Sequence, residues 1–161
     1  MDQEGADLRE RDLSGAALAG ANLRRANLSY ALLVRAQLAR AILAQAEMRG
    51  AVLYEADLSE ADLSEAVLVG AGLERAQLPF AKLRGVNLER AGLRNANLRD
   101  ADRSGADLSK ADLGYANLDR ANLCGAVFAQ ASLWGAVLTG ATYDKDTVWP
   151  EGFTPERAVL V

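Results

Sequence analysis

The sequence of 161 residues has no histidine, a single cysteine and few aromatic side chains. The lack of histidine removes the side chain most often used for general acid–base catalysis and for zinc binding. No glycine-rich phosphate loop and no cluster of residues with the spacing of metal ligands occurs in the sequence either. We therefore predict that the protein is not an enzyme and holds no metal or cofactor.

Other absences bear on location. Cys124 has no second cysteine to pair with, so an internal disulfide is excluded. No stretch of ~18 apolar residues, the length needed to cross a bilayer, occurs in the chain. Residues Met1 to Gly5 are acidic and lack the basic and apolar regions of a signal peptide. These features predict a cytoplasmic protein without a membrane partner.

What the chain does contain is one five-residue motif, A-(D/N)-L-x-x, repeated from Ala6 to Lys145. The same frame fits 28 times without insertion or deletion, with leucine at the central position of 24 repeats and alanine two residues earlier in 26. An α-helix turns ~100° per residue, so positions five apart would spiral round it instead of forming a stripe. A strand alternates with period two, so successive leucines would point to opposite faces. The pattern is buried only if the chain turns a corner every five residues.

The 28 tandem copies resemble the pentapeptide-repeat proteins. This resemblance covers about nine-tenths of the chain and implies an all-β fold, a right-handed quadrilateral parallel β-helix (solenoid) of about seven coils with four repeats each. Residue n would then lie under residue n+20, at the ~4.8 Å spacing of paired strands. We divide the chain into an N-terminal extension (1–5), a pentapeptide-repeat β-helix (6–145) and a C-terminal capping tail (146–161).

The corners carry their own signal. Nine of the 14 glycines fall two residues after the central position, where a type II turn requires positive φ. Pro79 falls at the preceding turn position, which suits its fixed φ. We expect corners with arginine or glutamate at the glycine position to use type I or irregular turns.

Five outward positions of the first coils are apolar where polar residues are the rule, and they should share one neighbourhood: Tyr30, Leu32, Val34, Val52 and Tyr54. A contiguous exposed apolar group can mark an interface. We treat these residues as a candidate surface for another protein, and a tolerated local patch as the alternative.

Charge bears on the best-known role of the family. Some similar proteins, including quinolone-resistance factors, imitate B-form DNA and occupy a topoisomerase, which requires long acidic columns. In this chain Arg35, Glu55 and Arg75 follow one another at intervals of twenty, and the net charge is only −4. We therefore favour a rigid protein-interaction scaffold, with a DNA-mimicking gyrase inhibitor or protection factor as the alternative. Direct nucleic-acid binding is not expected, because the only notable basic cluster is small: Arg24, Arg25, Arg35, Arg40 and Arg49.

One central position breaks the rule. Arg103 lies between Leu83 and Leu123 in an inward column, where an unpaired cation would cost several kcal/mol. We expect the segment to bulge, or the side chain to reach water with help from Asp100 or Asp102. A functional alternative is that the bulge presents Arg103 to an anionic partner.

Both ends need protection. In the tail, Val148, Trp149 and Phe153 are expected to cover the open end of the last coil, since terminal repeats of a solenoid require a cap. The alternative to this intramolecular cap is dimerisation through the same end. At the other end the edge is expected to be exposed and could pair with a second copy in a homodimer, around Leu8, Leu13, Leu18 and Leu23.

Overall fold

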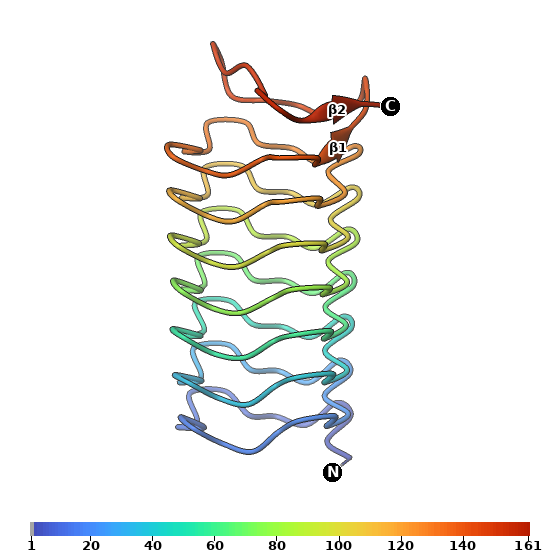
Figure 1. The fold of residues 1–161 in the computed structure, drawn as a ribbon. Coiled ribbons are helices and arrows are strands. Elements are labelled where there is room, and N and C mark those ends of the chain that lie inside the picture. Colours follow the sequence, from blue (N-terminus) through green and yellow to red (C-terminus); the bar gives the residue numbers. More distant parts are fainter. Residues whose placement is uncertain (1) are drawn as a thin grey trace.

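A computed structural model describes residues 2–161, and the chain winds through it as a stack of similar coils (Figure 1). Isolated parallel bridges join residues twenty apart, from Asp2 and Asn22 to Asn122 and Thr142. Each turn closes with a backbone hydrogen bond, such as that from Ala26 N to Leu23 O at 3.0 Å, and these turns recur every five residues. Residues 2–161 contain no helix, so the prediction of a parallel β-helix is confirmed.

Alanine and leucine fill the interior as the repeat predicts. From Ala21 to Leu98 the side chains at both inward positions are at most 1% exposed. A column of leucines stacked at the ~4.8 Å strand spacing buries nearly all of its apolar surface, and each buried leucine contributes roughly 1.5–3 kcal/mol. The core is therefore continuous along the stack.

The N-terminal end is more covered than the sequence suggested. Leu8 and Leu13 are half-buried, whereas Leu18 and Leu23 are buried. The expectation of an exposed edge was therefore wrong for Leu18 and Leu23. Residues 2–5 explain the burial of Leu23, because Gln3 N donates to Asn22 O at 2.8 Å and thereby lies beneath it. This stretch, predicted as part of an extension, already follows the ladder of the repeats; Met1 lies outside the described residues.

All corners up to residue 140 have the same backbone conformation. The nine glycines predicted to need positive φ have it, with values from +59° to +70°. The non-glycine corners adopt it too, for example Glu55 at +56° and Arg75 at +59°, so the expectation of type I or irregular turns there was wrong. Stacking enforces one geometry because each corner N–H from Gly5 to Arg120 donates to a carbonyl of the next coil. The left-handed conformation costs roughly 1–2 kcal/mol at a residue other than glycine.

The regular ladder ends in the last predicted repeat. Val127 pairs with Val148, twenty-one residues on, so one extra residue has entered the coil. The Asp144 carboxylate holds this wider turn: it accepts hydrogen bonds from Gly125 N at 2.9 Å and Asp146 N at 3.1 Å. The Gly125 N–H, followed by the Thr147 hydroxyl, holds the pKa of the Asp144 carboxyl below its ordinary value.

This turn predicts a pH-dependent contribution to stability. Because the folded-state pKa is lowered, the contribution is present above the ordinary carboxyl pKa of about 4 and is lost as the pH falls through the lowered value. Asp144→Asn should therefore lower the urea midpoint at pH 7 and have little effect near pH 2. Asp146→Asn, in the same turn but exposed, is the control and should have no effect at either pH. An equal loss for Asp144→Asn at both values would contradict the assignment.

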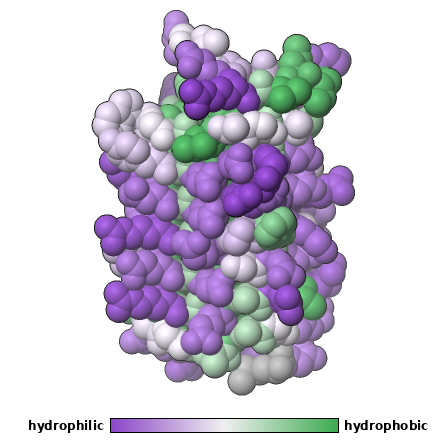
Figure 2. Space-filling view, viewed as in Figure 1, coloured by the Kyte–Doolittle hydropathy of each residue, from purple (hydrophilic) through white to green (hydrophobic). Residues whose placement is uncertain are grey.

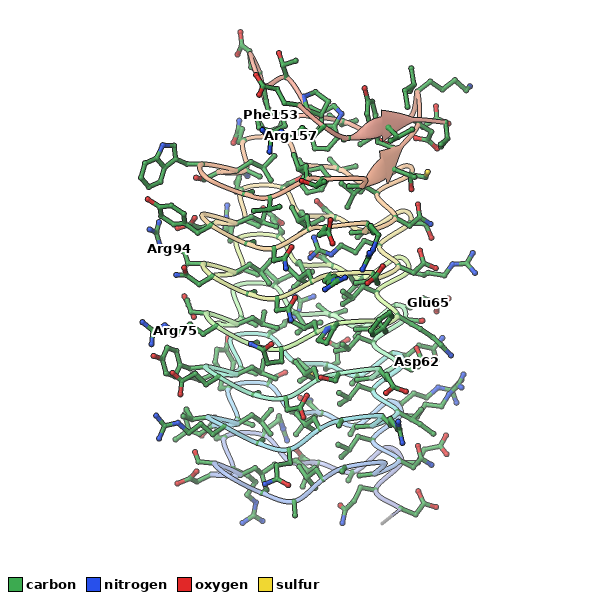
Figure 3. The ribbon with its side chains drawn as sticks, viewed as in Figure 1. Asp62, Glu65, Arg75, Arg94, Phe153 and Arg157 are labelled. Carbon is green, nitrogen blue, oxygen red and sulfur yellow. The ribbon has the colours of Figure 1, made fainter. Side chains whose placement is uncertain are left out.

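The tail crosses the top of the last coil. Strand β1 (Thr142–Tyr143) pairs in parallel with β2 (Val159–Leu160), and Gly140 N donates to Arg157 O at 2.9 Å. Figure 3 shows Phe153 and Arg157 above the last coil. Hydrophobic colour gathers near β2, whereas hydrophilic side chains cover most of the rest of that view (Figure 2).

Aromatic stacking closes the interior beneath the tail. The Trp149 ring lies parallel to that of Phe128, with centroids 5.0 Å apart and planes at 7°, and Phe153 packs against Trp149 at 5.4 Å. Val148, the third residue expected to cover the end, is 45% exposed and continues the backbone ladder instead. The contacts over the last coil thus come mainly from the two aromatic residues.

Candidate interaction surface

One side of the solenoid, here called the glycine face, combines apolar residues with bare backbone. Its outward residues are joined in one column by successive parallel bridges: Asp12, Leu32, Val52, Gly72, Gly92, Asp112 and Ser132. Above Asp12, the residues of this column change from apolar, through two glycines, to polar. The flanking corner residues add most of its charged and aromatic groups.

The five residues predicted as an apolar surface do come together at the lower part of the glycine face. Leu32 and Val52 are bridged, and their side chains are 41% and 36% exposed. Tyr30 is 63% exposed, and its ring covers Gly50, where a Cβ would lie 2.7 Å from Tyr30 Cδ1. Val34 and Tyr54 are half-buried beside them. We call these five residues the apolar patch.

Opposite charges alternate along the neighbouring corner, as the spacing of twenty predicted. Arg35 Nε lies 2.8 Å from Glu55 Oε2, and Arg75 Nη1 lies 3.4 Å from Glu55 Oε1. The hydrogen bond from Arg35, followed by the influence of the neighbouring Tyr54 hydroxyl, holds the pKa of the Glu55 carboxyl below its ordinary value. The Arg75 guanidinium also lies 5.8 Å from the centroid of the Tyr54 ring. The cations at this corner are therefore already engaged within the protein.

Above the apolar patch, the Glu74 side chain folds back over the glycine face. Its Cδ lies 2.9 Å from the point where a Cβ on Gly92 would stand, and its Oε2 lies 3.1 Å from the same point on Gly72. Any larger residue at Gly92 would displace this carboxylate. Sequence reasoning missed Glu74, although two outward glycines twenty residues apart were a readable signal of bare backbone.

The upper end of the glycine face is aromatic and polar. Arg94 Nη1 pairs with Asp112 Oδ2 at 3.3 Å and lies over the Tyr115 ring at 6.0 Å. Tyr115 and Trp134 meet edge to face with centroids 4.7 Å apart, and Trp134 is 67% exposed. Figure 3 shows Arg75 and Arg94 projecting from one edge of the solenoid, opposite Asp62 and Glu65. These aromatic residues also escaped prediction as part of a surface.

Arg103 is not where the sequence led us to expect it. The segment does not bulge: Arg103 N donates to Asn122 O at 2.9 Å, and the side chain points inward with 0% exposure. None of its three guanidinium nitrogens has a hydrogen-bond partner. Burial lowers the pKa of Arg103 to about 9, so the group is still charged at neutral pH. The prediction that it reaches water or an aspartate was wrong, because stacking keeps this residue in the common inward register.

The described part of the chain holds little else that suggests a binding site. No group of three or more histidine, cysteine, aspartate or glutamate side chains in residues 2–161 is placed to hold a metal ion. Within the same range no helix is long and apolar enough to cross a membrane. An open groove on another corner is lined by Ser64, Glu65, Arg84, Gly85 and Ser104.

Comparisons with known proteins agree with this architecture. The family model described as pentapeptide repeats (8 copies) matches residues 4–34, 31–70, 76–114 and 104–142. No match was found among curated protein sequences. Solved structures that resemble the chain include HetL, a pentapeptide repeat protein involved in heterocyst differentiation regulation from the cyanobacterium Nostoc sp. The identity is 36% over 91% of this chain and 73% of HetL, with a TM-score of 0.55.

Two further structures are similar over shorter stretches. A second pentapeptide repeat protein from Nostoc is 38% identical over 65% of this chain and 84% of its own, with a TM-score of 0.56. One from the thylakoid lumen of Arabidopsis thaliana is 36% identical over 55% of this chain and 62% of its own, with a TM-score of 0.54.

Proposed function

The chain belongs to the pentapeptide-repeat family, and from this premise we propose that it is a non-enzymatic, rigid scaffold that binds another protein through the glycine face. The observation that carries the proposal is the contiguous apolar patch, which includes Tyr30 at 63% exposure and Leu32 at 41%. Exposed apolar groups that touch one another, with polar residues round them, are typical of interaction sites. Rigid stacking holds these side chains in fixed positions, so little order has to be gained on binding.

Charge placement favours this role over imitation of DNA. Duplex DNA presents one negative charge per ~1.7 Å of its axis. Here Glu55 is neutralised from both neighbouring coils, by Arg35 and Arg75, and Glu60 pairs with Arg40 at 3.0 Å. Over the whole chain, 22 acidic side chains are offset by 18 basic ones. A gyrase inhibitor or protection factor is therefore the second candidate only.

Two finer features complete the proposal. We infer a right-handed solenoid with seven four-sided coils, which is supported by four turns between bridged residues twenty apart. We also infer a cytoplasmic location, although one of the similar structures comes from the thylakoid lumen. Binding through the glycine face is possible in either compartment, because it depends on side chains of this chain alone.

Affinity capture with two matched variants tests the scaffold. Tyr54→Asp places a charge within the apolar patch, whereas Phe80→Asp changes an exposed aromatic residue on a different corner. Burying an unpaired carboxylate in an interface costs several kcal/mol, so a partner of the glycine face should be lost from Tyr54→Asp by more than tenfold and retained by Phe80→Asp. Mass spectrometry identifies the partner, and titration with the purified partner gives the Kd. Capture of the same proteins by all three forms would contradict the proposal.

A supercoiling assay separates the two candidate functions. A scaffold without a topoisomerase target should leave DNA supercoiling by purified gyrase unchanged and should not relieve a quinolone block. Inhibition that survives Tyr54→Asp would instead support the gyrase alternative, because that activity would then depend on another surface.

A further inference from the structure

The glycine face has an unbalanced pattern of charge pairing. Three of the arginines beside it are engaged: Arg35 and Arg75 pair with Glu55, and Arg94 pairs with Asp112. Glu74 makes no ion pair and accepts no hydrogen bond within residues 2–161. The centre of the face therefore offers a free carboxylate, and the one arginine in this range without an ion pair beside the column, Arg11, lies at its lower end next to Asp12.

The position of this carboxylate is unusual for a surface glutamate, and the residue is half-buried. Because Gly72 and Gly92 have no side chains, Glu74 lies down on the backbone of two successive coils instead of extending into water. The Val52–Gly72 bridge joins this bare area directly to the apolar patch. At ~4.8 Å per coil, the step from Val52 to Gly92 is roughly 10 Å along the axis. An extended peptide rises ~3.3 Å per residue and so covers that step with about three residues.

We propose that the glycine face binds an extended segment of a partner protein in which apolar side chains are followed, two to four residues later, by a lysine or arginine. This inference rests on the proposed scaffold function and names the chemistry of its partner. The apolar side chains pack on Leu32, Val52 and Tyr54, and the basic side chain crosses the two glycines to pair with Glu74. Because Gly72 and Gly92 have no side chains, Glu74 is the side chain that lies over this stretch of backbone, and the segment can approach it closely enough for this contact.

Charge complementarity sets both the orientation and the selectivity of this binding. An acidic side chain over the glycines would face Glu74, and like charges at short range are strongly disfavoured. A basic side chain completes a charge-assisted hydrogen bond that the free protein lacks. The net charge of −4 also favours the approach of a basic segment. A segment with its basic residue on the other side of the apolar residues would place that residue near Glu10 and Asp12 but also beside the unpaired Arg11, which would repel it.

Selection from a random peptide library displayed on phage, with the wild-type protein as bait, tests the proposal. Enriched peptides should share a lysine or arginine two to four residues after an apolar pair. A synthetic, fluorescently labelled copy of an enriched peptide should then bind Glu74→Gln roughly tenfold or more weakly than wild type. Changing the basic residue of the peptide to glutamine should weaken binding to wild type by a similar factor, with little further loss on Glu74→Gln. Glu65→Gln, on the opposite edge, is the matched control and should bind like wild type.

The outcomes separate this inference from the function on which it rests. Peptides that need Tyr54 but lack a basic residue, or that bind Glu74→Gln as tightly as wild type, overturn the inference and leave the scaffold intact. If no selected peptide loses binding on Tyr54→Asp, the glycine face is not a binding surface and the proposed function fails with it. Far-ultraviolet circular dichroism of each variant confirms that the fold is retained.

Discussion

Replacing Arg103 with leucine should raise the free energy of unfolding by about 3–5 kcal/mol. The guanidinium is fully buried, has no hydrogen-bond partner and is held among leucines of an apolar column. Leucine occupies the same register one coil below, at Leu83, and one coil above, at Leu123, so the replacement fits the stack. The gain should appear as a higher urea midpoint and as a rise in Tm of roughly 10 °C.

Further variants at this position separate charge from shape. Arg103→Met removes the charge and keeps an unbranched chain, so it should stabilise nearly as much as leucine, whereas Arg103→Lys should not. The pKa of Arg103 gives a further check. Because the folded protein disfavours the charged guanidinium, the loss of folding stability that this charge causes is constant below about pH 9 and lessens as the pH rises further. The difference in the free energy of unfolding between wild type and Arg103→Leu should therefore become smaller above that pH. A leucine variant no more stable than wild type would mean that the guanidinium finds a partner in solution.

Removing the Trp149 side chain should lower the free energy of unfolding, by an amount comparable to the gain expected for Arg103→Leu. Trp149 stacks on Phe128 and also contacts Tyr143 at 5.5 Å and Phe153 at 5.4 Å, so Trp149→Ala exposes the end of the core. Truncation of a packed tryptophan costs about 3–5 kcal/mol. Because coils of a solenoid contact only their neighbours, the loss should be concentrated at the C-terminal end. Hydrogen exchange should therefore accelerate in residues 123–143 much more than in residues 23–63.

The chain provides its own control for this experiment. Trp134 is 67% exposed, so Trp134→Ala should change the free energy of unfolding by less than about 1 kcal/mol. Trp149→Phe should be tolerated better than alanine, since the buried Nε1 has no hydrogen-bond partner to lose. Equal effects of the two alanine variants would show that the tail does not cover the core in solution.

The repeat made most of the architecture predictable from sequence. Position fixes burial, so Leu63 and Ala66 could be assigned to the core without coordinates, and spacing by twenty placed Arg35, Glu55 and Arg75 in contact. The proximity of the apolar patch followed from the same arithmetic. These successes share one cause: each depends on the backbone ladder, which keeps the same offset of twenty residues up to Asn122 and Thr142.

The errors arose where side-chain preference opposed that ladder. Arg103 would favour water and Glu55 would favour a right-handed turn, but both follow the common backbone because departure would break hydrogen bonds to adjacent coils. Glu74 escaped notice for another reason: its conformation depends on empty space above two glycines, not on its own type. The extra residue near Asp144 has no signal in the spacing of the motif, since a turn can absorb it.

Because bridged neighbours are twenty residues apart, the length of the protein can change only in steps of one twenty-residue coil if the columns are to stay in register. Deleting one complete coil of twenty residues would shorten the solenoid by about 4.8 Å and leave every remaining column in register. Excising a single motif of five would instead shift everything downstream by one corner, so that Trp134 no longer lay in the same column as Tyr54. Duplication of whole twenty-residue coils, in evolution or by design, can thus lengthen this surface without changing its columns.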